Sequence, residues 1–318
     1  MAWLVGIDEA GYGPNLGPLV MTAVLGRVPD ELGIPDLWQV RAAAVRRGTD
    51  RTPAPVIVDD SKVIHDGDAG VGPLERCVLA VLEFWRQTPT LASFLERFSL
   101  SPDEVRQERW FHGQTSLPCE CLASDLETNA QVVRQACAAS GVSLGGPLVF
   151  ALCPRRFNAL VERAGSKGAA LAQGFAELVR RVFRELPPGE AVHVFVDKHG
   201  GRNTYAAMVQ DAVEEGMVLV RQESLARSVY VVEGASRPAS FTFQPRADSE
   251  HFCVALASMV SKYCRELLML EFNAYWAKLV PDLKPTAGYP GDAARFLAAI
   301  RPVMDKLGVA MESIWRQK

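Results

Sequence analysis

The sequence predicts an α/β protein, in which helices cover a β-sheet. Short apolar runs that are typical of strands come first, and helices and strands then alternate along most of the chain. Hydrophobic residues occupy 48% of the 318 positions, and charged residues occupy only 22%. A chain of this composition can bury a large core, so we expect one folded domain over residues 1–318 and not a disordered protein.

Three apolar runs predict the first strands. Residues 3–7 form a short apolar run that ends at Asp8, as a buried strand would. A glycine-rich turn follows over residues 11–17, and residues 19–25 predict a second strand in a hairpin with the first. Residues 56–58 predict a third, shorter strand.

Helices predominate in the next part of the chain. Residues 74–86 have helical spacing, with apolar side chains on one side. From about residue 88 to residue 145 we expect short helices broken by prolines. One of them begins at Ser101 and Pro102, where a serine cap and a first-turn proline are typical of a helix start. No chemistry can be assigned to this stretch, so we predict an inserted helical segment or subdomain.

The second half alternates strands with helices and ends in a helical region. Strands are predicted at residues 148–152, 192–196, 218–220, 229–232 and 241–243, and helices at 169–186 and 204–215. A long helix is expected from about Asp248. Its apolar stripe consists of Phe252, Leu256, Val260, Tyr263 and Leu267. Shorter helices are expected after Pro290 and Pro302.

Charge, cysteine content and the N-terminus limit the classes of function. The net charge of −3 argues against DNA binding by bulk electrostatics, although a local basic strip remains compatible with it. Seven cysteines, an odd number, give no disulfide framework and fit reduced thiols. The apolar start is too short for a signal peptide, and no stretch approaches the ~20 apolar residues that span a bilayer. We therefore expect a cytoplasmic protein with no membrane association.

Adjacent acids end the first strand. Asp8 and Glu9 follow an apolar run, where two carboxylates are costly unless they bind something positive. Neighbouring side chains on a strand point to opposite faces, so both reach one metal only if the chain bends, and Gly11 and Gly13 allow a bend. A polar strand end is the alternative explanation. The glycine spacing is neither a dinucleotide fingerprint nor a phosphate-binding loop, but it suits a backbone that lies close to a polynucleotide.

Two further acids have a structural and a functional interpretation. Asp197 ends a predicted strand, and Asp248 stands where it could cap the long helix. On that helix His251, Ser258, Lys262 and Arg265 fall on roughly one face, which is either a phosphate track or a solvated face. We favour the solvated interpretation for Arg265.

Five segments, in order along the chain, closely resemble motifs of ribonuclease HII. They are residues 6–18 (GIDEAGYGPNLGP), 60–62 (DSK), 194–197 (VFVD), Asp248 with residues 257–266 (ASMVSKYCRE), and 288–289 (GY). Residues 65–145 and 200–246 do not match visibly.

The resemblance implies a ribonuclease H-like mixed sheet flanked by helices and a metal-dependent endonuclease. Asp8, Glu9, Asp197 and Asp248 would be the catalytic acids and would hold two Mg²⁺ or Mn²⁺ ions, for which oxygen ligands are suited. The expected partner is an RNA–DNA hybrid or ribonucleotide-containing DNA, cut to 5′-phosphate and 3′-hydroxyl ends. No protein partner is indicated.

The same resemblance implies residues that contact the substrate. They are Gly11, Tyr12, Gly13, Ser61, Lys62, Ser258, Lys262 and Tyr289. Tyr289 lies between a glycine and a proline, where an exposed aromatic ring can stack on a sugar or base. His199 is a candidate auxiliary residue for proton transfer or phosphate contact.

One position departs from the pattern of ribonuclease HII. Tyr12 stands where that family has arginine, and here the chain is more similar to ribonuclease HIII. The alternatives are therefore an enzyme that does not cut at single ribonucleotides, another nuclease of the same fold, and a non-catalytic hybrid-binding protein.

Overall fold

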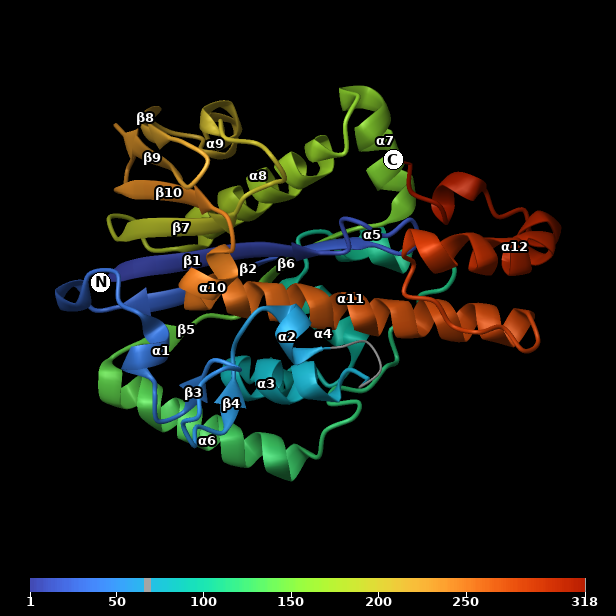
Figure 1. Ribbon diagram of the computed structural model, residues 1–318, viewed down its shortest axis with the longest axis horizontal. Helices are drawn as coiled ribbons and strands as arrows, with labels where there is room; N and C mark the ends of the chain where they lie inside the picture. The colour runs from blue at the N-terminus through green and yellow to red at the C-terminus, as the bar shows by residue number, and fades with distance from the viewer. Residues whose placement is uncertain (66–69, 318) are drawn as a thin grey trace.

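The computed structural model describes residues 1–65 and 70–317, and a mixed β-sheet lies at its centre (Figure 1). The described residues form eight strands in this sheet. In chain order they are β1 (Ala2–Ala10), β2 (Leu19–Val28), β5 (Ser143–Leu144), β6 (Leu148–Leu152), β7 (Ala191–Asp197), β8 (Met217–Glu223), β9 (Ser228–Glu233) and β10 (Ala239–Gln244). The order across the sheet is β5-β2-β1-β7-β10-β9-β8, and β6 also pairs with β2. β1, β7 and β10 are parallel and the other pairs antiparallel, so the expected mixed sheet is confirmed.

Three helices cover one face of the sheet. They are α7 (Pro154–Ala164), α8 (Gly168–Glu185) and α9 (Ala206–Ala212). Ile7 of β1 and Met21 of β2 belong to the same buried apolar cluster as Phe175 and Val179 of α8. The strands alternate their side chains, so the other side chains of β1 and β2 supply a second core on the opposite face.

The long helix α11 (Phe252–Leu279) lies along this opposite face and packs on β1 and β2. Gly6 of β1 permits the close approach, because a Cβ at this position would stand 2.1 Å from the carbonyl carbon of Cys253. No helix in residues 1–65 and 70–317 combines the length and the apolar character needed to cross a membrane.

Helices from the first half of the chain enclose α11 on the side away from the sheet (Figure 1). Leu91 and Leu126 of the predicted segment 88–145 belong to the same buried cluster as Leu256 and Leu267 of α11, so the segment shares the core of the domain. The elements of this part of the chain are η1 (Asp30–Leu32), α1 (Leu37–Val40), β3 (Val45–Arg46), β4 (Val56–Ile57), α2 (Ser61–Ile64), α3 (Gly72–Leu82), η2 (Phe84–Arg86), α4 (Leu91–Phe98) and α6 (Ala123–Ser140). The short helix α5 (Pro102–Arg106) instead lies above α11 in Figure 1 and packs on β6.

Two buried glutamates fasten this segment. Glu75 of α3 accepts backbone hydrogen bonds from Cys119, Glu120 and Cys121 at 2.7–2.8 Å, and another at 2.6 Å from the Tyr263 hydroxyl of α11. Although burial opposes ionisation, these hydrogen bonds together hold the pKa of Glu75 below its usual range. The hydrogen-bonding capacity of this buried carboxylate is thus satisfied by a loop that lies more than forty residues further along the chain.

Glu271 makes the second attachment. Its carboxylate accepts the backbone N–H groups of His112 and Gly113 at 2.9 Å and the Thr115 hydroxyl at 2.8 Å. The segment is therefore joined to α11 by hydrogen bonds to charged groups as well as by apolar packing.

Four details differ from the prediction. The strand at 56–58 is β4, which pairs with β3 outside the main sheet. The long helix does not begin at Asp248, because the extended backbone of His251 separates a short α10 (Ala247–Glu250) from α11. One helix, α12 (Pro290–Leu307), runs through Pro302 because its buried side chains continue at helical spacing on both sides of the proline. The helix α7 was not predicted, and η3 (Met311–Ser313) follows α12.

Candidate active site

The four predicted acids lie at one end of the sheet. Asp8 and Glu9 are close to the end of β1, and Asp197 is the last residue of β7, its parallel neighbour. The Asp197 carboxylate accepts a hydrogen bond of 3.4 Å from the N–H of Ala247, the first residue of α10. This contact fixes the start of α10 next to β7, and Asp248 is the next residue along that helix.

The acids raise one another's pKa values. Burial, and then the charge of Glu9, hold the pKa of Asp8 well above its usual range. Burial, and then the charge of Asp197, raise the pKa of Glu9 to about 7. Burial raises the pKa of Asp197, and burial followed by the charges of Asp60 and Asp197 raises that of Asp248. Each carboxylate is thus destabilised in its charged form by burial or by its neighbours.

A hard divalent cation fits this donor set chemically. The donors are carboxylate oxygens, which Mg²⁺ and Mn²⁺ prefer, and a cation would relieve both the repulsion and the burial cost. The charge of Lys62 lowers the pKa values of Glu9, Asp197 and Asp248, but it is one charge against four. Among residues 1–65 and 70–317, no three Asp, Glu, His or Cys side chains come close enough together to hold a metal ion. The donor set therefore fits in chemistry and charge, with side chains that do not converge on one point.

A pocket of about 250 Å³ opens beside Glu9. It is lined by residues from β1 and the loop after it, from α2, from α11 and from the turn before α12. Every residue predicted to contact substrate lines it, except Ser258. The lining residues are Glu9, Ala10, Gly11, Tyr12, Gly13, Pro14, Ser61, Lys62, Lys262, Arg265 and Tyr289. Segments that are up to 280 residues apart in sequence thus meet at one pocket.

Ser258 lies behind this pocket and connects it to the acids. Its hydroxyl is 3.1 Å from the Ser61 hydroxyl, and it also hydrogen-bonds to the Asp8 carboxylate. Both serines are buried. Ser61 stands in the first turn of α2, where Asp60 caps the helix by accepting the N–H of Lys62 at 3.0 Å. The serine pair therefore holds the Asp-Ser-Lys turn against Asp8.

Two buried arginines shape the glycine loop. Arg265 donates to the carbonyls of Leu16 and Pro18 at 3.3 Å, and Arg316 donates to the carbonyls of Gly11 and Pro14 at 2.5 Å. Gly11 has a φ of +90°, and a Cβ there would stand 2.5 Å from Arg265 Nε. Glycine is required at this position both by the backbone conformation and by the arginine below it.

Charged and aromatic side chains define the walls of the pocket. Lys62 is exposed, whereas Lys262 is paired with Glu266 at 2.6 Å. Tyr289 is 49% exposed, and its ring lies against the loop, because a Cβ at Gly13 would be 3.9 Å from its Cε1. The arrangement can accept a polyanion that carries planar groups.

Tyr12 faces a basic neighbour. The Lys167 ammonium stands 5.9 Å from the centre of its ring, at the turn before α8. Burial, and then the charge of Glu9, raise the pKa of the Tyr12 hydroxyl, so the side chain is neutral at physiological pH.

His199 is not among the residues that line this pocket. Its ring makes edge contacts with Tyr205 and Phe243, with centroids 6.0 and 6.5 Å apart. Burial, and then the charge of Arg202, lower its pKa to about 4. The structure therefore places a neutral histidine in an aromatic cluster next to the β7 end, and its auxiliary role stays a prediction.

Sequence reasoning missed Arg265 and Arg316 as supports of the site. Arg265 was expected on a solvated face, and that expectation is wrong because its side chain is buried under the glycine loop. In the sequence, an arginine at helical spacing gives the same pattern whether its side chain is exposed to solvent or buried. Arg316 carried no sequence signal at all.

No protein-family model and no curated protein sequence matches this chain. Similar solved structures include the ribonuclease H2 from Pyrococcus horikoshii, with a TM-score of 0.49 and 14% identity over 98% of this chain and 92% of that chain. The ribonuclease HII of Archaeoglobus fulgidus, solved in complex with PCNA, has a TM-score of 0.42 and 15% identity over 99% and 94%. Bst-RNase HIII in complex with Mn²⁺ has a TM-score of 0.41 and 14% identity over 99% and 66%. Likeness at this level does not establish an activity, so the assignment of function has to rest on the site.

Proposed function

We propose that this protein is a divalent-metal-dependent endonuclease that hydrolyses the RNA strand of RNA–DNA hybrids to 5′-phosphate and 3′-hydroxyl ends. The observation that carries the proposal is the meeting of four distant segments at one pocket. There a carboxylate, two lysines, two tyrosines and a glycine loop stand together at the sheet end that bears the other acids. A site for a small neutral ligand would not need this much charge of both signs.

Asp8, Glu9, Asp197 and Asp248 are the residues that would hold Mg²⁺ or Mn²⁺. Two such ions, when bound, supply an activated water and stabilise the leaving oxygen of a phosphodiester. The raised pKa values support this role, because burial and mutual repulsion oppose the charged forms of these acids, and a bound cation would offset that cost.

The other residues of the pocket bind and orient the nucleic acid. Lys62 and Lys262 neutralise backbone phosphates, and Tyr289 offers an exposed ring to a sugar or base. Gly11 and Gly13 let the backbone approach the strand closely, so that peptide groups can test for a 2′-hydroxyl. Ser61 and Ser258 act as positioning residues, because they hold Lys62 and Asp8 in register.

The test is cleavage of three labelled duplexes with Mg²⁺ and with Mn²⁺: an RNA–DNA hybrid, DNA with one embedded ribonucleotide, and plain DNA. We expect the hybrid to be cut. Asp8→Asn and Asp197→Asn should each lower the rate at least about a hundredfold, because each removes a charge that a catalytic ion needs. Asp211→Asn, which changes an exposed acid on α9, is the matched control and should leave the rate unchanged.

Failure to cut any duplex with either metal would overturn the catalytic proposal. Retained binding of the hybrid under those conditions would instead indicate a non-catalytic hybrid-binding protein on this fold.

A second candidate concerns specificity. Tyr12, a neutral residue, lines the pocket at the position where ribonuclease HII has arginine. We therefore propose a specificity like that of ribonuclease HIII, with little cleavage at a single embedded ribonucleotide. Efficient cleavage of that duplex by the unmodified protein would contradict this, and Tyr12→Arg should raise the ratio of single-ribonucleotide to hybrid cleavage.

A further inference from the structure

Two basic side chains that are distant in sequence come together beside the candidate active site. Lys167 precedes α8, and Arg202 stands in the loop between β7 and α9. A Cβ at Gly168, the residue after Lys167, would be 3.9 Å from Arg202 Nη2, so the two cations are neighbours. Lys167 and Arg202 are called the basic pair below.

Tyr12 joins the basic pair to the glycine loop. The Lys167 ammonium stands 5.9 Å from the centre of the Tyr12 ring. Burial, and then the charge of Glu9, raise the pKa of the Tyr12 hydroxyl, whereas the charge of Arg202 lowers it, so Arg202 also lies near this side chain. Tyr12 itself lines the pocket beside Glu9, and the basic pair therefore borders that pocket.

The basic pair and the lysines of the pocket lie on opposite faces of the sheet. Tyr12 packs against the apolar cluster beneath α8, and the Arg202 guanidinium stands 5.9 Å from the ring of Tyr205, which belongs to the same cluster. Lys62 and Lys262 stand on α2 and α11, on the other face. The glycine loop thus has cations on both sides.

Arg202 has donors available for a phosphate. Its side chain is exposed and, within the residues that the structure describes, it has no carboxylate partner. Its guanidinium hydrogen-bonds to the Met208 sulfur at 3.8 Å, and a thioether is a weak acceptor. A guanidinium carries five N–H groups in a fork that matches a phosphate, so most of its hydrogen-bonding capacity is unused.

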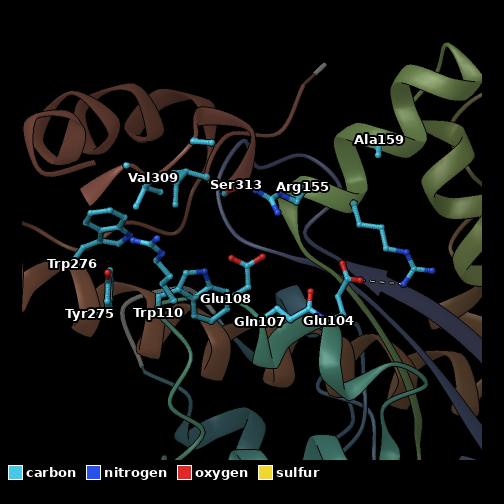
Figure 2. Close-up of a pocket in the computed structure, with 15 residues that line it drawn as sticks. Glu104, Gln107, Glu108, Trp110, Arg155, Ala159, Tyr275, Trp276, Val309 and Ser313 are labelled. Carbon is cyan, nitrogen blue, oxygen red and sulfur yellow. Dashed lines mark hydrogen bonds and ion pairs between the residues drawn. The ribbon is translucent and has the colours of Figure 1, made fainter. Parts of the chain in front are cut away.

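A larger cavity elsewhere suits a polynucleotide less well. It has a volume of about 420 Å³ and lies between α5, α7, the end of α11 and residues 308–314 (Figure 2). Its arginines share it with Glu104 and Glu108, and its two tryptophans are 1% and 3% exposed, so it presents no open ring face. It shares no lining residue with the pocket beside Glu9, so the two are separate.

The shape of an RNA–DNA hybrid explains why cations stand on both sides of the glycine loop. The 2′-hydroxyl groups of an A-form helix line its wide minor groove, so a loop that tests for them lies in that groove, with one strand on each side. Lys62 follows Ser61, whose hydroxyl is linked through Ser258 to Asp8. The RNA strand that is cut therefore lies on the Lys62 side, and the complementary strand lies on the side of the basic pair.

We propose that Lys167 and Arg202 bind backbone phosphates of the DNA strand of the hybrid, across the minor groove from the strand that is cut. The proposal rests on the proposed function, because it takes the hybrid as the substrate and the glycine loop as the groove contact. It adds a reason why a duplex is preferred, since a single RNA strand at the acids does not reach the basic pair.

The experiment is fluorescence anisotropy of the whole protein with a short labelled hybrid, in EDTA and at several salt concentrations. Arg202→Gln and Lys167→Gln should each weaken binding about fivefold at low salt. Each should also reduce the slope of log affinity against log salt by about one, because one phosphate contact is lost. Arg202→Lys should keep most of the slope because the charge remains, which a purely structural role of Arg202 would not explain.

Arg97→Gln is the matched control. Arg97 is an exposed arginine on α4 whose guanidinium also stands close to a neighbouring ring, 5.5 Å from the centre of Phe98. It does not line the pocket beside Glu9, so its replacement should change neither the affinity nor the slope.

Two further ligands identify the strand. In a hybrid whose DNA strand carries neutral methylphosphonate linkages, Arg202→Gln should have no further effect, because the phosphate charge that it contacts is already removed. Lys62→Gln should still weaken binding of that hybrid, because Lys62 faces the RNA strand. With single-stranded RNA, Arg202→Gln should bind as the wild type does.

Three results would overturn the proposal. They are an unchanged salt slope in both Arg202→Gln and Lys167→Gln, an effect of Arg202→Gln that persists with the neutral DNA strand, and no binding of the hybrid in EDTA, where phosphate contacts need no metal. The expected binding changes without any cleavage in Mg²⁺ or Mn²⁺ would support this proposal and refute only the nuclease activity, so the two failures are distinguishable.

Discussion

Replacing Glu9 by glutamine should change how the stability of the metal-free protein depends on pH. Burial, and then the charge of Asp197, raise the pKa of Glu9 to about 7 from an ordinary value of 4.5. The folded protein therefore holds this proton more tightly than the unfolded chain does. Glutamine occupies the same volume but cannot ionise, so the variant lacks this contribution to the pH dependence.

The sign and the size follow from proton linkage. Below about pH 4.5 the carboxyl is protonated in both states and contributes no difference. As the pH rises towards about 7, the unfolded chain releases the proton while the folded protein keeps it, so the free energy of unfolding falls. Above about pH 7 the full loss is present. At about 1.4 kcal/mol per tenfold change in proton affinity, it amounts to about 3 kcal/mol.

Urea denaturation in EDTA, at about pH 4.5 and about pH 8, measures the effect. Between these two conditions the wild-type protein should lose about 3 kcal/mol more stability than Glu9→Gln. Glu162→Gln, which changes an exposed acid on α7, should behave like the wild type. Added Mg²⁺ should restore stability at about pH 8 in the wild-type protein more than in Glu9→Gln, by mass action on the folded state. Equal pH dependence of wild type and Glu9→Gln would refute the reasoning, because the carboxyl would then titrate as it does in solvent.

Three further predictions concern buried charged groups. Glu75→Gln should lower the free energy of unfolding by about 3 kcal/mol or more in urea denaturation, because an amide N–H₂ would face backbone donors that now bind a carboxylate. Arg41→Met should raise that free energy by at least about 1 kcal/mol. The Arg41 side chain is 0% exposed, and its three guanidinium nitrogens have no hydrogen-bond partner among the described residues. Arg316→Gln should release the carbonyls of Gly11 and Pro14, so it should lower kcat/KM for hybrid cleavage about tenfold while the circular dichroism spectrum stays unchanged.

The strands were predictable because the sheet is covered on both faces. β6 was predicted with its observed limits, and β1, β7 and β10 to within a few residues. A strand with helices on both sides reads as an unbroken apolar run, which a single sequence shows clearly. The position of the acids followed from the same pattern, since each of Asp8 and Asp197 stands at the end of such a run.

The attachment of the segment 88–145 could not be predicted in the same way. Glu75 and Glu271 stand on helices, where glutamate is usually a solvated residue, and nothing in their local sequence differs from that case. Their partners are backbone N–H groups of loops far away in sequence, such as those of Cys119 and Gly113. Almost every residue type has a backbone N–H group, so the order of residue types does not show which of these groups will bind a distant carboxylate.

The helix α11 shows why Arg265 was misinterpreted and what its buried polar residues do. The sheet lies on one side of it and α3 on the other, so Ser258, Ser261 and Arg265 are all buried. A buried polar group needs a partner, and each of these has one in the candidate active site. Ser258 hydrogen-bonds to the Asp8 carboxylate, Ser261 donates to the Asp8 carbonyl at 3.0 Å, and Arg265 holds the carbonyls of the glycine loop. The helix therefore connects the acid-bearing strand, the Asp-Ser-Lys turn and the glycine loop through buried polar side chains. A substitution on this buried face should consequently disturb the geometry of the site as well as the packing of the core, whereas one at the exposed Leu270 on the same helix should disturb neither.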